Sequence, residues 1–257
     1  MKIVTFNLRT LAEEDKEQNF IYRFPFIKEK IGAEKPDIIG MQEMTSNMRD
    51  YVINGLTDYY LVGGCRNADR FGEGVCIAFN KNRFTLNDCE TFWLSETPDV
   101  PGSRYPEDQS IYPRTCVSAL LTDNETKVTF RFYVMHTDHE GKIARLRADK
   151  QLKEVLASRK GEPFIITGDF NASPTSPEIE VMTNGELVEM EDVTSHIKHS
   201  FHNFGRWMTP FANSEWKIDY IFVSKDFKAE DVHTWEDKKD YLFLSDHYPI
   251  SAIISNK

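Results

Sequence analysis

Short runs rich in β-branched and aromatic residues recur along the whole chain, and this recurrence constrains the possible folds most strongly. Runs of about four to eight such residues are typical of strands that are buried in a sheet. The strands predicted in this way are Lys2–Phe6, Asp37–Met41, Val75–Asn80, Thr115–Leu121, Val128–Met135, Phe164–Thr167, Ile218–Val223 and Ile250–Ile254.

Two segments between these strands repeat apolar residues at the spacing of a helix. The first, residues 20–31, is expected to end at Gly32, and the second, residues 143–156, is expected to stop at Gly161. Strands and helices that alternate over the whole length predict one α/β or α+β domain, covering residues 1–257.

The chain is acidic, with 31 Lys and Arg against 41 Asp and Glu and a net charge of −10. Tight binding to duplex nucleic acid usually depends on a basic surface that neutralises phosphates, so strong duplex binding is not expected. A cluster of carboxylates around a divalent cation suits this charge better. No obligate protein partner is inferred from the sequence.

The sequence has no apolar run of the ~20 residues that a membrane-spanning helix requires, and its first residues turn polar too soon for a signal peptide. The four cysteines are Cys65, Cys76, Cys89 and Cys116, and their spacing matches neither a zinc site nor a disulfide-rich scaffold. We therefore expect a protein of the reducing cytoplasm that has no membrane partner.

Polar residues collect where the predicted strands end, which is where an α/β sheet usually places its site. Taken one at a time, each has an ordinary explanation as a turn residue, a helix start or an ion-pair partner. Six clusters drawn from the same residue types are harder to explain in that way. They are Asn7, Gln42-Glu43, His136–His139, Gly168–Asn171, Asp219, which is expected within a strand, and Ser245–His247.

This set of residues suits the hydrolysis of a phosphate ester. Glu43 is the kind of hard oxygen ligand that binds Mg²⁺. Asp169 could take a proton from the attacking water, whose position Asn171 would fix. His247 backed by Asp219 would form a carboxylate–imidazole pair with a cationic histidine. His136 could then protonate the leaving oxygen or hold a non-bridging one.

Rival chemistries fit less well. The sequence contains no Gly-x-Ser-x-Gly, no Gly-x-x-x-x-Gly-Lys-Ser/Thr and no His-Glu-x-x-His motif. The Gly72-x-Gly74 pair lacks the third glycine of a dinucleotide-binding turn, so that interpretation is discarded.

At this point the motifs, in their order along residues 2–254, resemble the endonuclease/exonuclease/phosphatase superfamily. Two further segments, Thr91–Pro98 and Ser200–Gly205, resemble an uncharacterised bacterial branch near the deadenylase and nocturnin-type enzymes. The motifs are Thr5-Phe6-Asn7-Leu8-Arg9, Met41-Gln42-Glu43, His136-Thr137-Asp138-His139, Gly168-Asp169-Phe170-Asn171-Ala172, Ile218-Asp219-Tyr220-Ile221 and Ser245-Asp246-His247.

The resemblance implies a deoxyribonuclease-like, four-layer sandwich of two packed mixed β-sheets flanked by helices. It implies Mg²⁺, or Mn²⁺, held chiefly by Glu43, with Asn7 and Asp246 in or next to the metal shell. It assigns the attacking water to Asp169 and Asn171. It assigns the phosphate contacts to His136 and to the pair of Asp219 and His247.

The chain departs from the abasic-site repair branch at Arg9, where that branch usually has an aspartate, so repair activity is not expected. Arg9 becomes a candidate phosphate contact instead, together with Arg114 and His139. Arg145 could also reach the phosphate, or it could form an ordinary ion pair.

Segments outside the predicted strands could contact the rest of the substrate. The proline-rich segment Leu94–Tyr112 is expected to be a long surface loop, and such loops often carry function. Four aromatic residues could stack on a base or could instead anchor loops and core: Trp93, Phe201, Phe204 and Trp207.

The sequence therefore predicts a magnesium-dependent hydrolase of phosphoester bonds, of the phosphodiesterase or nuclease type. The alternatives are a phosphomonoesterase that acts on a small metabolite, a deadenylase-type 3′–5′ RNA exonuclease, and a binding scaffold that has lost turnover. A membrane lipid is disfavoured because no basic amphipathic helix is evident.

Overall fold

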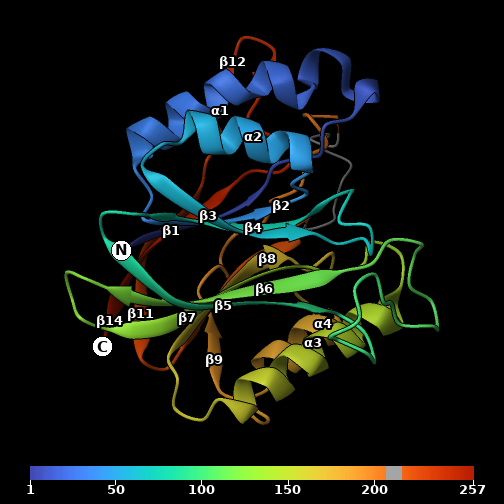
Figure 1. Ribbon diagram of the computed structural model, residues 1–257, viewed down its shortest axis with the longest axis vertical. Helices are drawn as coiled ribbons and strands as arrows, with labels where there is room; N and C mark the ends of the chain where they lie inside the picture. Colours follow the sequence, from blue (N-terminus) through green and yellow to red (C-terminus); the bar gives the residue numbers. More distant parts are fainter. Residues whose placement is uncertain (207–215) are drawn as a thin grey trace.

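Two six-stranded mixed sheets pack face to face, and helices cover their outer surfaces in the computed structural model, which describes residues 1–206 and 216–257 (Figure 1). Helices α1 and α2 lie on one outer face, and α3 and α4 lie on the other. This is the four-layer sandwich that the resemblance implied, so the fold prediction is confirmed. Within the described residues, no helix combines the length and the apolar character needed to cross a bilayer.

The first sheet has the strand order β11-β14-β1-β2-β4-β3, and the second has the order β5-β6-β7-β8-β10-β9. The strands of the first sheet are β1 (Lys2–Asn7), β2 (Ile38–Gln42), β3 (Tyr59–Cys65), β4 (Gly74–Asn80), β11 (Phe227–Thr234) and β14 (Ile250–Asn256). Those of the second sheet are β5 (Phe84–Trp93), β6 (Thr115–Asp123), β7 (Thr129–His136), β8 (Phe164–Asp169), β9 (Met190–Asp192) and β10 (Asp219–Ser224).

The helices are η1 (Glu13–Gln18), α1 (Phe20–Glu34), α2 (Ser46–Gly55), α3 (Lys142–Ser158) and α4 (Pro177–Thr183), and a small hairpin pairs β12 (Lys238–Lys239) with β13 (Leu242–Phe243). The expected end of the first helix at Gly32 was wrong. The helix continues to Glu34 and is closed by Lys35 in the left-handed conformation. A Cβ at Gly32 would meet no neighbouring atom within 4 Å, so nothing in the packing forces the helix to stop there.

The main core lies between the inner faces of the two sheets. Fully buried aliphatic and aromatic side chains from both sheets fill it, among them Ile77, Val117, Phe132 and Ile221. The sheets approach closely at Gly40 of β2, where an added Cβ would lie 2.0 Å from Oγ1 of Thr167 in β8. Only glycine fits at this position without moving the sheets apart.

The topology brings the ends of four strands to one edge of the sandwich. β1 and β2 run parallel, as do β7 and β8, so the carboxyl ends of each pair lie together. β10 runs antiparallel to β8 and begins at that edge with Asp219, which faces Asp169 in the register. Asp219 is thus the first residue of its strand, whereas the sequence placed it in the middle of one.

Two other expectations, one about the long loop and one about the cysteines, hold in the structure. Residues 94–114 contain turns and bends without regular secondary structure, as expected of a long loop. All four cysteines are free.

Candidate active site

A hollow of about 300 Å³ opens at the edge of the sandwich where these strand ends converge. The predicted catalytic, metal and phosphate-contact residues line it, except for Asn7, Asp219 and Arg145. Asn7 and Asp219 form hydrogen bonds with residues of the lining. The predicted residues that line the hollow are Arg9, Glu43, Arg114, His136, His139, Asp169, Asn171, Asp246 and His247.

Asn7 joins the two sheets across this edge. Its Nδ2 donates to Oε1 of Glu43 at 3.0 Å and to Oδ2 of Asp169 at 2.9 Å. Its Oδ1 accepts the backbone N–H of Arg9 at 2.9 Å. Because Asn7 is 1% exposed, these contacts fix the relative position of the two carboxylates.

Glu43 is held in its charged form. Its Oε2 accepts the backbone N–H of Thr10 at 2.8 Å. Burial alone would raise the pKa of Glu43, but the Thr10 N–H, the Asn7 amide and the nearby His247 and Arg9 lower it below its ordinary value. The backbone of Glu43 has φ of 59°, a left-handed conformation that is uncommon for residues other than glycine.

Asp169 ends β8 in the centre of the polar cluster. Its Oδ1 accepts the backbone N–H of Asn171 at 2.9 Å, and Asn171 is itself left-handed with φ of 46°. Burial and the neighbouring Asp219 raise the pKa of Asp169 to about 7. A carboxylate with such a pKa is a stronger base than an ordinary aspartate and can still release its proton near neutral pH.

The two buried histidines flank Asp169 but differ in charge. Nε2 of His136 lies 3.6 Å and Nε2 of His247 lies 3.8 Å from Oδ2 of Asp169. Nδ1 of His247 bonds Oδ2 of Asp219 at 2.8 Å. Burial alone would lower the pKa of His247, but Asp219, with help from Asp246 and Asp169, raises it to about 10.

His136 has the opposite character. Burial, together with the positive charges of Arg114 and Arg66, lowers the pKa of His136 well below its ordinary value. At neutral pH, His247 is therefore a cation and His136 is a neutral imidazole.

The donor set of the hollow fits a hard divalent cation. Burial and the negative charge of Glu43 raise the pKa of Asp246. A cation bound between the two carboxylates would relieve the repulsion that Glu43 exerts on Asp246. A tighter group is formed by Asp169, Asp219 and His247, whose ligand atoms lie within 4.8 Å of one another. Since Asp219 and His247 already bond each other, Glu43 and Asp246 are the better candidates to hold a metal.

The arginines predicted to contact phosphate have different surroundings. Arg9 lines the hollow, although its Nε and Nη2 bond the carboxylate of Asp15 at 2.9 and 3.1 Å. Arg145 does not line the hollow. Its Nε donates to Glu178 and its Nη1 to the carbonyl of Asp138, both at 3.0 Å, so it forms a buried structural ion pair.

Four residues of the wall were not predicted from the sequence as site residues, namely Arg66, Glu73, Tyr112 and Ile218. Arg66 and Glu73 follow β3 and precede β4, and their Nη1 and Oε2 atoms pair at 2.9 Å. The available signal was Gly74, because an added Cβ there would lie 1.8 Å from the carbonyl oxygen of Gly64. That glycine allows the paired ends of β3 and β4 to approach closely before the loop of residues 66–73, and it does not form a nucleotide-binding turn.

Of the aromatic residues considered for stacking that the structure describes, Phe201 is the one that lines the hollow, with its ring centroid 4.8 Å from that of His247. Trp93 instead donates from Nε1 to the carbonyl of Arg66 at 2.6 Å, which anchors the hairpin. Phe204 lies under the guanidinium of Arg23 at 5.7 Å. Trp207 lies outside the described residues.

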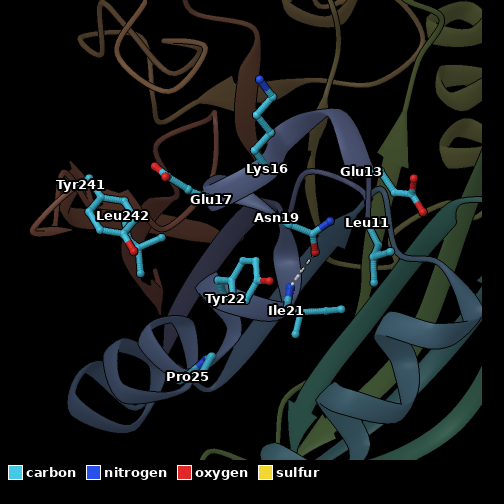
Figure 2. Close-up of a pocket in the computed structure, with 10 residues that line it drawn as sticks. All are labelled: Leu11, Glu13, Lys16, Glu17, Asn19, Ile21, Tyr22, Pro25, Tyr241 and Leu242. Atoms are coloured by element: carbon cyan, nitrogen blue, oxygen red, sulfur yellow. Dashed lines mark hydrogen bonds between the residues drawn. The ribbon is translucent and has the colours of Figure 1, made fainter.

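A larger hollow, of about 790 Å³, lies beside the start of α1 (Figure 2). Figure 2 shows its mixed lining and the Asn19 side chain that accepts the N–H of Ile21 and caps the helix. No predicted site residue lines it. The lining residues are Leu11, Glu13, Lys16, Glu17, Asn19, Ile21, Tyr22, Pro25, Tyr241 and Leu242.

Comparison with solved structures gives matches over the whole chain. An endonuclease/exonuclease/phosphatase from Bacteroides vulgatus has a TM-score of 0.92 and 29% identity, over 100% of this chain and 98% of the other. A mannosyl-6-phosphatase of Bacteroides thetaiotaomicron has a TM-score of 0.87 and 27% identity, over 99% of both chains. The human nocturnin catalytic domain shares the fold, with a TM-score of 0.74 and 18% identity over 100% of this chain and 93% of its own.

An uncharacterized protein of Acanthamoeba polyphaga mimivirus is 28% identical over 159 residues, which are 55% of this chain and 55% of the viral protein. That match thus spans about half the length of the relative. The model of the Endonuclease/Exonuclease/phosphatase family matches residues 4–247, which is most of the chain and includes every motif described above. This chain therefore belongs to the endonuclease/exonuclease/phosphatase family, whose members are hydrolases of phosphoric esters.

Proposed function

We propose that the protein is a magnesium-dependent hydrolase in which Asp169 activates a water molecule for in-line attack on a phosphoester. The observation that carries the proposal is the position of Asp169. It is held by the Asn7 amide and the Asn171 N–H, lies between two histidines, and lines the same hollow as Glu43 and Asp246.

Glu43 and Asp246 would hold the cation, and Oδ1 of Asn7 keeps a lone pair that could join them. Magnesium needs only one or two protein carboxylates because it keeps most of its water. When bound, it supplies a Lewis acid for a phosphoryl oxygen. The proposal places the cation among the acidic residues that repel each other in its absence.

Asp169 would take one proton from the attacking water. The water oxygen would then form its bond to phosphorus while the bond from phosphorus to the ester oxygen breaks. A base whose pKa is near 7 combines the correct protonation state with useful proton affinity at neutral pH. Asn171 lines the hollow beside Asp169, where it can orient the same water.

The two histidines would divide the stabilisation of the phosphoryl oxygens. His247, cationic through Asp219, would donate a charge-assisted hydrogen bond to an oxygen that gains charge in the transition state. His136, which is neutral, suits the role of holding a non-bridging oxygen better than that of protonating the leaving group.

The experiment measures the hydrolysis of a panel of substrates by the purified protein, once in the presence of Mg²⁺ and once in the presence of a chelator. The panel contains 4-nitrophenyl phosphate, bis(4-nitrophenyl) phosphate, oligo(A), nicked duplex DNA and sphingomyelin. The Asp169→Asn variant, purified in parallel, controls for contaminating phosphatases. The proposal predicts Mg²⁺-dependent hydrolysis of at least one ester by the parent protein and strong loss in the variant. Hydrolysis that survives the chelator, or that the variant retains, would contradict it.

A further inference from the structure

One part of the hollow's wall consists of two buried arginines, of which the proposed mechanism uses neither. Arg66 is 6% exposed and Arg114 is 4% exposed, and both line the hollow with His136. They come from different sheets, Arg66 from the end of β3 and Arg114 from the residue before β6. Their positive charges reach the ring of His136, whose pKa they help to lower.

Arg66 is fixed on three sides. Its Nη1 pairs with Oε2 of Glu73 at 2.9 Å, and its guanidinium lies over the Tyr112 ring at 4.8 Å from the centroid. Its backbone carbonyl accepts Nε1 of Trp93. An arginine held in this way loses little conformational freedom when it binds a ligand.

Arg114 is fixed from the other sheet. Its Nη2 contacts Nδ1 of His139 at 2.8 Å, and its Nε makes a long contact of 3.4 Å to Oδ2 of Asp138. Because arginine can only donate, the first contact makes Nδ1 of His139 the acceptor. His139 is thereby turned toward Arg114 at the rim of the hollow.

Both arginines line the hollow, and each guanidinium also holds one solvent-inaccessible nitrogen without an acceptor among the described residues. Nε of Arg66 and Nη1 of Arg114 are buried and find no hydrogen-bond acceptor anywhere in residues 1–206 and 216–257. Buried charged donors without an acceptor are costly and uncommon. Phosphate oxygens are the acceptors that arginine recognises best, and this wall borders the hollow where the phosphoester would bind.

We propose that Arg66 and Arg114 form an anion subsite that selects phosphomonoesters over phosphodiesters. The proposal rests on the function proposed above and names its substrate class. Near neutral pH a phosphomonoester carries close to two negative charges on three non-bridging oxygens. A diester carries one charge on two such oxygens, and its second organic group would occupy the place of the third oxygen, against the arginines. The small volume of the hollow agrees with a compact substrate.

The test compares Arg66→Gln and Arg66→Lys with the matched control Arg70→Gln, an exposed arginine of the same hairpin. Two quantities are measured with Mg²⁺ present. One is kcat/KM for 4-nitrophenyl phosphate and for bis(4-nitrophenyl) phosphate, and the other is the Kd of inorganic phosphate by titration calorimetry. Arg66→Lys keeps the charge, so it remains informative if Arg66→Gln does not fold.

We expect the parent protein to prefer the monoester. Arg66→Gln should lower kcat/KM for the monoester by about 30- to 100-fold, as expected for a lost charge-assisted hydrogen bond, and should weaken phosphate binding by about tenfold. The diester rate should change little, Arg66→Lys should show a smaller loss of the same kind, and Arg70→Gln should match the parent protein.

A parent protein that prefers the diester, or an Arg66 variant that loses both activities equally, would overturn the subsite. These failures differ from failure of the proposed function. If diester hydrolysis depends on Mg²⁺ and Asp169 but no Arg66 variant changes the preference between monoester and diester, the proposed function is supported and the proposed subsite is contradicted. If no ester is hydrolysed, the proposed function is contradicted. If, in addition, Arg66→Gln binds inorganic phosphate as tightly as the parent protein does, the proposed subsite is contradicted as well.

Discussion

The space between the sheets and the edge where they open are built from the same strands but have opposite properties. Between the sheets, β7 and β8 contribute fully buried apolar side chains such as Phe132 and Ile165. At their carboxyl ends the same strands present His136 and Asp169, which are also buried but polar. The interior supplies stability, whereas the edge holds the left-handed residues Glu43 and Asn171 and a group of crowded carboxylates, features that are common at functional sites.

This contrast shows how the site depends on the core. Asn7 of the first sheet bonds Asp169 of the second, so the distance between the sheets sets the distance between the candidate metal carboxylates and the candidate base. The sheets also approach closely farther inside, where an added Cβ at Gly40 would meet the side chain of Thr167.

The largest expected effect comes from moving the sheets apart. Gly40→Ala places a Cβ against Oγ1 of Thr167, and we expect a loss of about 3 kcal/mol in the free energy of unfolding. Gly64→Ala in β3 is the matched control, because a Cβ there meets no atom within 4 Å. Urea unfolding measures both variants. Equal stability of the two would show that the close approach at Gly40 is not a constraint.

A change at the edge should separate function from stability. Glu43→Gln should raise the Mg²⁺ concentration for half-maximal activity by about a hundredfold, a typical effect of weakening a metal site. Its unfolding free energy should fall by only about 1–2 kcal/mol, because a glutamine has a single acceptor oxygen and can keep only one of the hydrogen bonds from Thr10 and Asn7. Glu180→Gln, at an exposed position on α4, is the control. An unchanged Mg²⁺ titration would remove Glu43 from the metal site.

The smallest effect concerns Asp138, which lies two residues beyond the end of β7 and bonds the connecting segments around Ser110 and Gly141. Burial would raise its pKa, but the N–H groups of Gly141 and Ser110, the Ser110 hydroxyl and Arg114 lower it from 3.8 to about 2. A lowered pKa stabilises the folded protein above the unfolded-state pKa, and this stabilisation is lost as the pH falls toward 2.

At pH 6 we expect Asp138→Asn to be about 2 kcal/mol less stable than the parent protein, and we expect the difference to shrink by pH 2.5. Urea unfolding at both pH values tests this, with Asp99→Asn as the exposed control. A difference that is the same at both pH values would mean that the charge of Asp138 is not what stabilises the fold.

The sequence predicted the central strands and most of the site for one reason. Strands buried on both faces are continuously apolar, and the polar residue that ends each of them stands out, as Asn7 and Asp169 do. The strands β3, β5, β9 and β11 were missed because they are the edge strands of the two large sheets, where partly exposed positions interrupt the apolar runs.

The rest of the site depends on contacts between distant segments. Arg66 and Tyr112 meet between a hairpin and a long loop, and neither segment has a periodic pattern. The neutral state of His136 depends on arginines that are distant in sequence, so its own motif could not predict it. Arg145 carries the same charge as Arg114, yet it faces Glu178, which only the packing of α3 against α4 determines.

The most direct test of the account uses Asp169→Asn with two readouts on one preparation, kcat on the preferred ester and Mg²⁺ affinity by calorimetry. If Asp169 is the base beside a cation held by Glu43 and Asp246, kcat falls by about 10²–10⁴ while Mg²⁺ affinity is retained. Turnover equal to that of the parent protein would contradict the account, as would a loss of turnover fully explained by lost Mg²⁺ binding.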